Sequence, residues 1–285
     1  MPTLPMVRQV TTADITSLSS LISNAEYVHR HLDWRSPIDW AGSYPFLGIE
    51  RESQWLSALA CPYVHNSAGW IRLFAFLNWN TAQLRDSWNL LFRQLLDTNI
   101  FPPGYILAGL GLNSWFADLL IGSGFLLRQH IVVLQWLDPI PQPVPIPVEV
   151  KIRPMQQRDL DLVLSVDNLA FEHIWQHTRE ELGFAFLQAT YATVAEMDEE
   201  IVGYQISTGT QFHAHLARLA VDPGMQRLSI GYGLVHDMLC HFKDAEISNI
   251  TVNTQSDNYS SLALYKKIGF HRTGDEFPVY TFPID

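Results

Sequence analysis

Apolar and polar side chains alternate most regularly in the second half of the chain, where the pattern predicts short strands and amphipathic helices. Apolar residues recur at helical spacing across 159–171, from Ile230 to Phe242, and across 260–267. Apolar or alternating runs bounded by turn residues predict strands at 148–153, 193–196, 201–207, 212–221, 250–254 and 279–282. The predicted order β-α-β-β-β-α-β-α-β combines hairpins with helical crossovers. It indicates an α/β fold, with a mixed, mostly antiparallel sheet flanked by helices.

The pattern of the second half is repeated in the first half at one constant offset. With this offset Asn113 falls on Asn258, and Gly124-Phe125 falls on Gly269-Phe270. The same offset aligns 7–8 with 152–153, 46–59 with 191–204, and 70–76 with 215–221. One offset that fits the start, middle and end of both halves indicates a duplication. We predict that residues 1–136 and 149–285 are two copies of one fold.

A proline-rich stretch separates the two predicted copies. Residues 137–148 hold prolines at alternate positions, a composition that favours extended polyproline geometry. We predict a semi-rigid linker there.

The composition excludes several classes of protein. With 285 residues, of which 47% are hydrophobic and 16% charged, the chain can bury a core and is not a disordered tail. The formal net charge is −11, and residues 149–285 hold nineteen acidic against ten basic side chains. This balance disfavours nucleic acid as a partner and suits a cationic one, although a solvated acidic surface is the more common explanation.

The cysteines and the hydropathy of the chain predict no disulfide framework, no metal site and no membrane segment. Cys61 and Cys240 lie in different halves, without the spacing of a metal site or a disulfide framework. The chain shows no apolar run typical of a signal peptide or a membrane span. We therefore expect a cytoplasmic protein with no metal site and no membrane partner.

A candidate anion site lies between the predicted strand at 212–221 and the helix that begins near Ile230. The first N–H groups of a helix have no partner inside it, and the helix dipole adds about half a positive charge there. Small residues at Ser229, Gly231 and Gly233 let a phosphate approach the backbone. Such a site needs no lysine, although Gly-x-Gly is also common in purely structural turns.

Two motifs in this half resemble the GCN5-related N-acetyltransferase (GNAT) superfamily. The acetyl-CoA signature of that family, Val-x-Pro-x-x-(Gln/Arg)-x-x-Gly-x-(Gly/Ala), resembles the run from Val221 to Gly231. A later family motif is matched by Asn258, Ser261, Leu264, Tyr265, Gly269 and Phe270. The resemblance covers residues 149–285 and reaches the first half only through the repeat. It implies two tandem GNAT-like domains, of which the first is degenerate.

The resemblance also implies where acetyl-CoA binds, namely where the neighbouring parallel strands 212–221 and 250–254 separate. The positions implied in binding the pantetheine arm and the pyrophosphate are Leu219, Ala220, Val221, Gln226, Arg227, Leu228, Ser229, Ile230, Gly231, Tyr232, Gly233 and Asn258. Tyr265 is implied as the acid that protonates the departing thiolate. A phenol with a pKa of about 10 can make this transfer to a thiolate whose acid has a pKa of about 8.5.

The residue that takes the proton from the attacking amine is less clearly marked. Many family members use a glutamate, and Asn253, which cannot accept a proton, stands where such a glutamate is often found. His213 and His215 alternate with Ala217, Leu219 and Val221, which predicts that all five share one face of the strand. We take His215, whose position carries the base in several family members, as the candidate base, directly or through water. A histidine with only a core or surface role is the alternative.

Two departures from the family pattern change these expectations. Ser229 replaces the first glycine of the pyrophosphate loop, so we expect cofactor binding to survive in a weaker form. In the first copy the counterpart of this loop, 76–83, has no glycine, and Leu120 stands in place of Tyr265. We expect no CoA site in the first copy.

The leading hypothesis is an acetyl-CoA-dependent N-acetyltransferase, which moves an acetyl group to a primary amine by direct attack in a ternary complex. A non-catalytic acyl-CoA-binding regulatory module is one alternative, because of Ser229 and the missing glutamate. A protein-interaction scaffold is another. The sequence does not specify the acceptor amine, small molecule or protein, and it fits a monomer or a homodimer.

Overall fold

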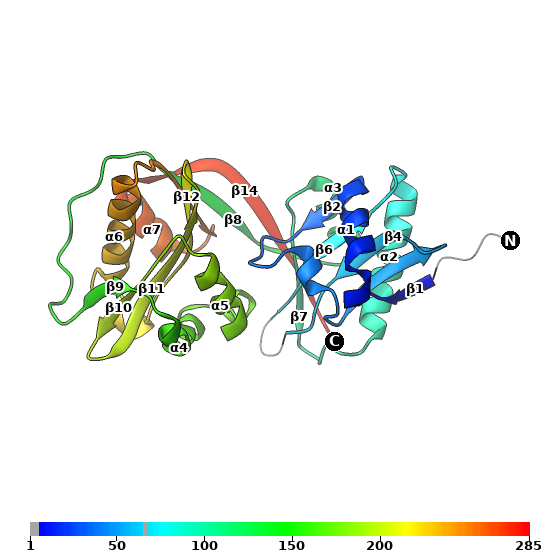
Figure 1. The fold of residues 1–285 in the computed structure, drawn as a ribbon, viewed down its shortest axis with the longest axis horizontal. Coiled ribbons are helices and arrows are strands. Elements are labelled where there is room, and N and C mark those ends of the chain that lie inside the picture. The colour runs from blue at the N-terminus through cyan, green and yellow to red at the C-terminus, as the bar shows by residue number, and fades with distance from the viewer. Residues whose placement is uncertain (1–5, 65–67) are drawn as a thin grey trace. The chain divides into compact units, whose positions relative to one another are not determined.

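The computed structural model describes residues 6–64 and 68–285, which divide into two compact units (Figure 1). The first unit extends to Arg128 and also includes Phe277–Asp285, and the second is Gln129–Glu276. Among the described residues, no helix is both long and apolar enough to cross a membrane. Both cysteines are free thiols.

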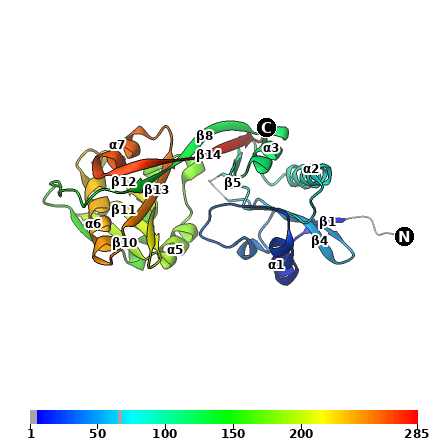
Figure 2. The same cartoon turned by 90° about the horizontal axis from the view of Figure 1, so that it is seen from above.

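The first unit is built mostly on antiparallel strands, with helices on both faces. Its elements are β1 (Met6–Gln9), η1 (Thr12–Asp14), α1 (Ile15–Asn24), β2 (Tyr27–Arg30), η2 (Pro37–Trp40), β3 (Phe46–Arg51), β4 (Gln54–Ala60), β5 (Gly69–Trp70), β6 (Leu73–Phe76), α2 (Thr81–Asp97), β7 (Ile106–Leu110), α3 (Ser114–Gly122) and the start of β8 (Leu126–Trp136). Five strands pair in the order β1-β3-β4-β6-β2, and β5-β7-β14 pair separately, with the pair β5–β7 parallel. Helix α1 lies on one face of the larger sheet, and helices α2 and α3 lie on the other (Figure 2). Their apolar side chains pack against the strands on these faces.

The second unit is a mixed, mostly antiparallel sheet between two pairs of helices. Its elements are β9 (Lys151–Pro154), η3 (Gln157–Asp159), α4 (Leu160–Ala170), η4 (His173–Trp175), α5 (Arg179–Gln188), β10 (Tyr191–Met197), β11 (Glu200–Gly209), β12 (His213–Val221), η5 (Pro223–Met225), α6 (Ile230–Asp244), β13 (Asn249–Gln255), α7 (Tyr259–Ile268) and β14 (Phe270–Pro283). The strands pair in the order β8-β13-β12-β11-β10-β9, and the pair β12–β13 is parallel. The fold class predicted from the sequence is confirmed.

The elements recur at the constant offset that the sequence shows. The short helix η1 falls on η3, and α3 falls on α7. Each copy also repeats one ion pair, because Arg8 bonds Asp14 at 2.8 Å and Arg153 bonds Asp159 at 2.7 Å. In both pairs the arginine follows the start of an edge strand and the aspartate precedes the first helix, so the pair joins the same two elements. The two copies of one fold are therefore visible in the structure.

The last strands of the two copies are exchanged. Residues Val279–Pro283 of β14 pair antiparallel with β7 in the first unit, and Ile131–Trp136 of β8 pair antiparallel with β13 in the second. By the offset of the repeat, β8 is the counterpart of β14, and β7 of β13. The compact units therefore do not coincide with the segments 1–136 and 149–285. Those boundaries stay a prediction about where the repeated sequence divides.

One helix of the second unit was not predicted from the sequence. Helix α5 holds Leu182, Phe184 and Phe186 at alternate positions, which is the spacing of a strand. The start of α5 is instead fixed by hydrogen bonds between neighbouring residues. The Thr178 hydroxyl accepts from the Glu181 amide at 3.1 Å, and the Glu181 carboxylate accepts from the Thr178 amide at 2.9 Å, a reciprocal capping box.

Candidate active site

The parallel strands β12 and β13 are paired over only part of their length. Pairing runs from His213↔Asn249 to Leu216↔Val252, and beyond it the described residues form no further β12–β13 pair. Arg218–Val221 stay paired with β11 on one side, while Asn253–Gln255 stay paired with β8. Beyond Leu216 the edge of β12 that faces β13 therefore lacks a strand partner in the part of the chain that the structure describes, although the Val221 carbonyl accepts a hydrogen bond from Gln226 Nε2 at 3.2 Å.

A β-bulge lies where the two strands separate. Ile206 pairs with Arg218 and Ser207 pairs with Leu216, so Ala217 is the extra residue. The bulge breaks the alternation that the sequence suggested. The prediction that His215 shares a face with Leu219 and Val221 was wrong, because Leu219 and Val221 face α6 and His215 does not.

The packing shows how the faces are divided. Leu219 and Val221 pack against Ile230 and Leu234 of α6. His215 instead bonds residues of β13 on the opposite face of the sheet. Where the two strands separate, helix α6 therefore lies on one face of the sheet and helices α4 and α5 lie on the other (Figures 1 and 2).

The loop between β12 and α6 has the backbone expected of an anion site. Asp222 accepts a hydrogen bond from the Gly224 amide at 2.7 Å and shapes the first turn. Arg227 and Ser229 both adopt left-handed conformations, with φ of 67° and 64°. Ser229 is the N-cap of α6, yet its side chain makes no capping bond. The first N–H groups of α6 are therefore left to water or to a ligand.

The glycines on this helix differ in what surrounds them. A Cβ on Gly231 would lie 3.4 Å from Leu264 and 3.5 Å from Val221, which is ordinary contact. A Cβ on Gly233 would come within 3.1 Å of Ile152 and 3.2 Å of Ile146, so this glycine lets the helix pack closely on its neighbours. Gly231 thus has more room around it than Gly233, and cofactor contact by both stays a prediction.

The structure places Tyr232 and Asn258 in structural roles. The Tyr232 hydroxyl donates to the Gln142 carbonyl at 2.9 Å. The Asn258 side chain accepts from the Ser261 amide at 3.1 Å and so caps α7. Cofactor contacts by these two residues stay predictions.

Tyr265 lies on α7 on the same face as α6. Its side chain is almost fully buried and packs against Phe270, with 5.6 Å between ring centroids. Burial raises the pKa of Tyr265 above its ordinary value. The phenol therefore stays protonated at neutral pH, which a proton donor requires.

His215 lies on the opposite face with both ring nitrogens engaged. Nδ1 lies 2.9 Å from Thr251 Oγ1, and Nε2 lies 2.7 Å from Asn253 Oδ1. Burial lowers the pKa of His215, an effect that the bond to Asn253 opposes. The ring is neutral, but it must release one partner before it can take a proton directly from an amine. His213 is exposed and lies 3.2 Å from Thr210 Oγ1.

In the first unit the corresponding strand edge is already occupied. β6 is the counterpart of Arg218–Val221, and β2 pairs with it along its whole length, from Tyr27↔Phe76 to Arg30↔Leu73. The other edge of β6 pairs with β4. The His29 ring then stacks on Phe116 of α3 at 3.7 Å. Strand β2 fills the place that is left open in the second unit.

A comparison with protein families agrees with this geometry. Residues 167–281 match the family model for an acetyltransferase (GNAT) domain. The chain carries a GNAT domain. No curated protein matches the sequence.

Solved GNAT structures share the fold over the whole chain. A GCN5-related N-acetyltransferase from Sphaerobacter thermophilus is 13% identical, with a TM-score of 0.63, and the match covers 98% of this chain and 95% of that one. A tandem GNAT protein from the clavulanic acid biosynthesis pathway is 12% identical, with a TM-score of 0.63 and coverage of 99% and 100%. A GNAT acetyltransferase from Colwellia psychrerythraea is 10% identical, with a TM-score of 0.59 and coverage of 98% and 100%. At such identities the likeness is one of fold.

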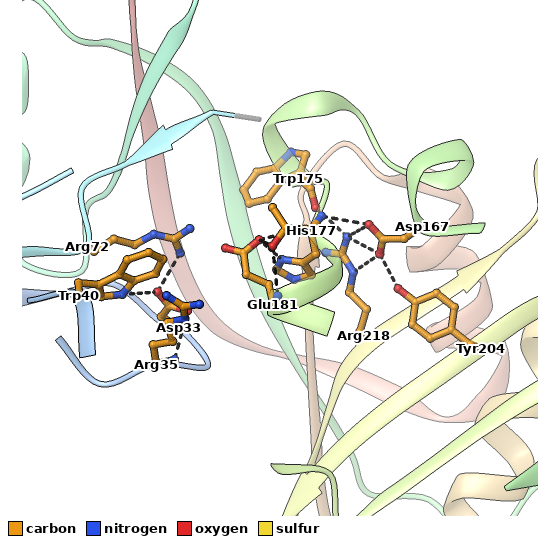
Figure 3. Close-up of polar contacts among 11 residues, drawn as sticks. Asp33, Arg35, Trp40, Arg72, Asp167, Trp175, His177, Glu181, Tyr204 and Arg218 are labelled. Carbon is orange, nitrogen blue, oxygen red and sulfur yellow. Dashed lines mark hydrogen bonds and ion pairs between the residues drawn. The ribbon is translucent and has the colours of Figure 1, made fainter. Parts of the chain in front are cut away.

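The GNAT domain also holds a buried polar cluster that the sequence did not reveal (Figure 3). The Asp167 carboxylate of α4 is fully buried and accepts from Arg218 Nε at 2.8 Å and Nη2 at 2.9 Å. It also accepts from the Tyr204 hydroxyl. Arg218 Nη2 donates to the Trp175 carbonyl at 2.7 Å. The cluster thus ties α4 and η4 to β12 directly after the bulge.

Proposed function

We propose that the protein is an acetyl-CoA-dependent N-acetyltransferase whose one site lies in the GNAT domain. The acceptor is a primary amine, which attacks directly in a ternary complex. A cytoplasmic location belongs to the same proposal, because free cysteines at separate sites fit a reducing compartment.

The observation that carries this proposal is the contrast between two equivalent strand edges in one chain. In the first unit β2 occupies the edge of β6. In the second unit the described residues leave the same edge of Arg218–Val221 without a strand partner. The pantetheine arm of CoA is an extended chain with two amide groups, so it suits an open edge of this kind. The uncapped start of α6 suits the adjoining pyrophosphate.

The residues present fit the cofactor and divide its binding among themselves. Backbone groups of Leu219, Ala220 and Val221 would hold the pantetheine arm, and amides of the loop that ends at Ser229 would hold the pyrophosphate. Acetyl-CoA supplies an activated acetyl thioester. Tyr265 would give a proton to the sulfur that leaves, so the acetyl group ends on nitrogen and CoA ends as the free thiol.

Calorimetry and an amine panel test the proposal. We expect acetyl-CoA to bind with one site per chain, and free thiol to be released in steady turnover with at least one class of amine. Tight acetyl-CoA binding with no turnover across a broad panel would support the regulatory module instead. Absence of binding at millimolar acetyl-CoA, or a second site of similar affinity, would contradict the proposal.

Gly231→Leu tests the location of the site. A bulky side chain at the start of α6 should weaken acetyl-CoA binding at least tenfold, because it blocks approach to the backbone. Gly122→Leu in α3 is the matched control, since a Cβ there meets nothing within 4 Å. Equal affinities for both variants would remove the α6 start from the site, provided that both melt as the wild type does.

A further inference from the structure

A second histidine lies beside the bulge, on the face of the sheet that carries α4 and α5. The backbone amide of His177 donates to Asp167 Oδ2 at 3.1 Å, the same carboxylate that Arg218 binds. Its Nδ1 lies 3.7 Å from Glu181 Oε2. Figure 3 shows the ring between the Glu181 carboxylate and the Arg218 guanidinium.

The place of His177 follows from its tie to Arg218. Arg218 is the residue directly after the unpaired Ala217, at the point where β12 and β13 separate. Asp167 and the Trp175 carbonyl both bind this guanidinium. The segment that carries His177 is therefore held against the open edge of β12, on the face opposite Tyr265.

Within the described part of the chain, the ring of His177 has one nitrogen with no hydrogen bond, whereas both nitrogens of His215 are engaged. Both nitrogens of His215 lie within 3.0 Å of side chains on β13. The His177 side chain is 25% exposed, and among the described residues no hydrogen bond engages its Nε2. A histidine that keeps one nitrogen for a carboxylate and the other for the substrate has the arrangement of a general base.

The charged groups that act on His177 come from three elements. Glu181 belongs to α5, Asp167 to α4 and Arg218 to β12. Burial lowers the pKa of His177, and Arg218 lowers it further, whereas Glu181 and Asp167 oppose the shift. The net effect is a neutral imidazole at pH 7, the form that can accept a proton.

From this arrangement we infer that His177, with Glu181 at its Nδ1, is the base that deprotonates the acceptor amine. The inference rests on the proposed function and names one of its catalytic residues. The ammonium N–H bond breaks, its electron pair stays on nitrogen, and the proton binds the Nε2 lone pair of His177 and passes to water. The nitrogen loses its second proton after it has gained the acetyl group, and that proton balances the one taken up by the thiol.

Replacement of each histidine separates the two candidate bases. We expect His177→Gln to lower kcat by about 10²-fold or more and to remove the acidic limb of the pH profile, with the Kd of acetyl-CoA unchanged. His173→Gln is the matched control, because His173 is an exposed histidine on the same segment whose ring contacts Gln176. Loss of the limb in His215→Gln, with a normal profile in His177→Gln, would overturn the inference.

A second readout needs no turnover. NMR of ring-labelled histidine gives the pKa of His177 in the free protein, and we expect Glu181→Gln to lower it, because the carboxylate that favours the charged ring is gone. Gln retains the capping bond at the start of α5, so the helix should persist. An unchanged His177 titration in this variant would show that Glu181 does not act on the ring and would contradict the dyad.

Different results would exclude His177 as the base and exclude acetyltransferase activity altogether. A wild-type protein that acetylates no amine would remove the function. A wild-type protein that turns over, with an intact acidic limb in His177→Gln, would leave the function standing and remove only His177.

Discussion

At the scale of single residues, the left-handed N-cap of α6 carries a cost. Ser229 has φ of 64°, a region that costs a non-glycine residue about 1 kcal/mol or more. The family signature has glycine at this position, and the observed backbone gives the physical reason.

Ser229→Gly should therefore raise the free energy of unfolding by about 1 kcal/mol. Urea unfolding measures the change. The matched control is Ser165→Gly in the exposed part of α4, a helical position where glycine should destabilise by about 0.5 kcal/mol. If both changes destabilise equally, the strain at Ser229 is absent.

Tyr265 is a second residue whose role can be separated from its packing. Phe keeps the contact with Phe270 but loses the proton. We expect Tyr265→Phe to lower kcat by about 10²-fold, with less than a twofold change in the Kd of acetyl-CoA. Wild-type turnover in this variant would exclude Tyr265 as the acid.

At the scale of elements, the two copies differ most at one short segment. Residues 27–30 form strand β2 in the first copy, and their counterparts, 172–175, include the turn of helix η4. In its extended form this segment closes the edge of β6. In its helical form it leaves the edge of β12 open. One local change of backbone conformation thus separates a closed edge from an open one.

The stability of β2 should depend on pH through His29. Burial lowers the pKa of His29 from 6.5 to about 4. The unfolded chain then binds a proton at a higher pH than the folded chain, so stability is lost as pH falls from about 6.5 to about 4. The full loss is about 3 kcal/mol, measurable by urea unfolding at a series of pH values.

His29→Gln supplies the control for this dependence, because it removes the titrating ring and keeps an N–H donor for the Ile71 carbonyl. Its stability should be flatter across the same pH range. A wild-type slope that survives in this variant would assign the effect to another group.

Much of the element order could be predicted from the sequence, and the exceptions have physical causes. The hairpin of β10 and β11 and the helices α6 and α7 follow clear apolar periods. Helix α5 was missed because its apolar residues alternate, and its cap is its only helical signal. The strand β2 is four residues long, too short for a period to show.

The candidate site was predictable only where it depends on backbone. The loop after Val221 is marked by its small residues and its turn. The bulge at Ala217 was not predictable, because it depends on the pairing register between β11 and β12. As a result of the bulge, Leu219 and His215 lie on opposite faces of the sheet. His177 was missed for a related reason, since its neighbours Asp167 and Arg218 belong to other elements and only the folded chain brings them together.

At the scale of the whole molecule, the exchanged strands make the first unit depend on the chain end. Tyr280 belongs to the apolar core of the first unit, and Phe282 packs against it. A chain that ends at Glu276 should expose the edge of β7 and speed hydrogen exchange at 106–110. Exchange in β10 and β11 should change little, because these strands pair within the second unit. Unaltered protection of 106–110 would contradict the pairing.

The same exchange bears on how the protein is made. During synthesis the chain up to Arg128 leaves the ribosome before Val279–Pro283 is made. Strand β7, which pairs with β5 on its other edge, therefore lacks its second partner until the second unit has been translated. The first unit therefore cannot complete its fold before the second unit has been translated. Splitting the gene between the two copies would likewise give two products, each holding a strand that the other needs.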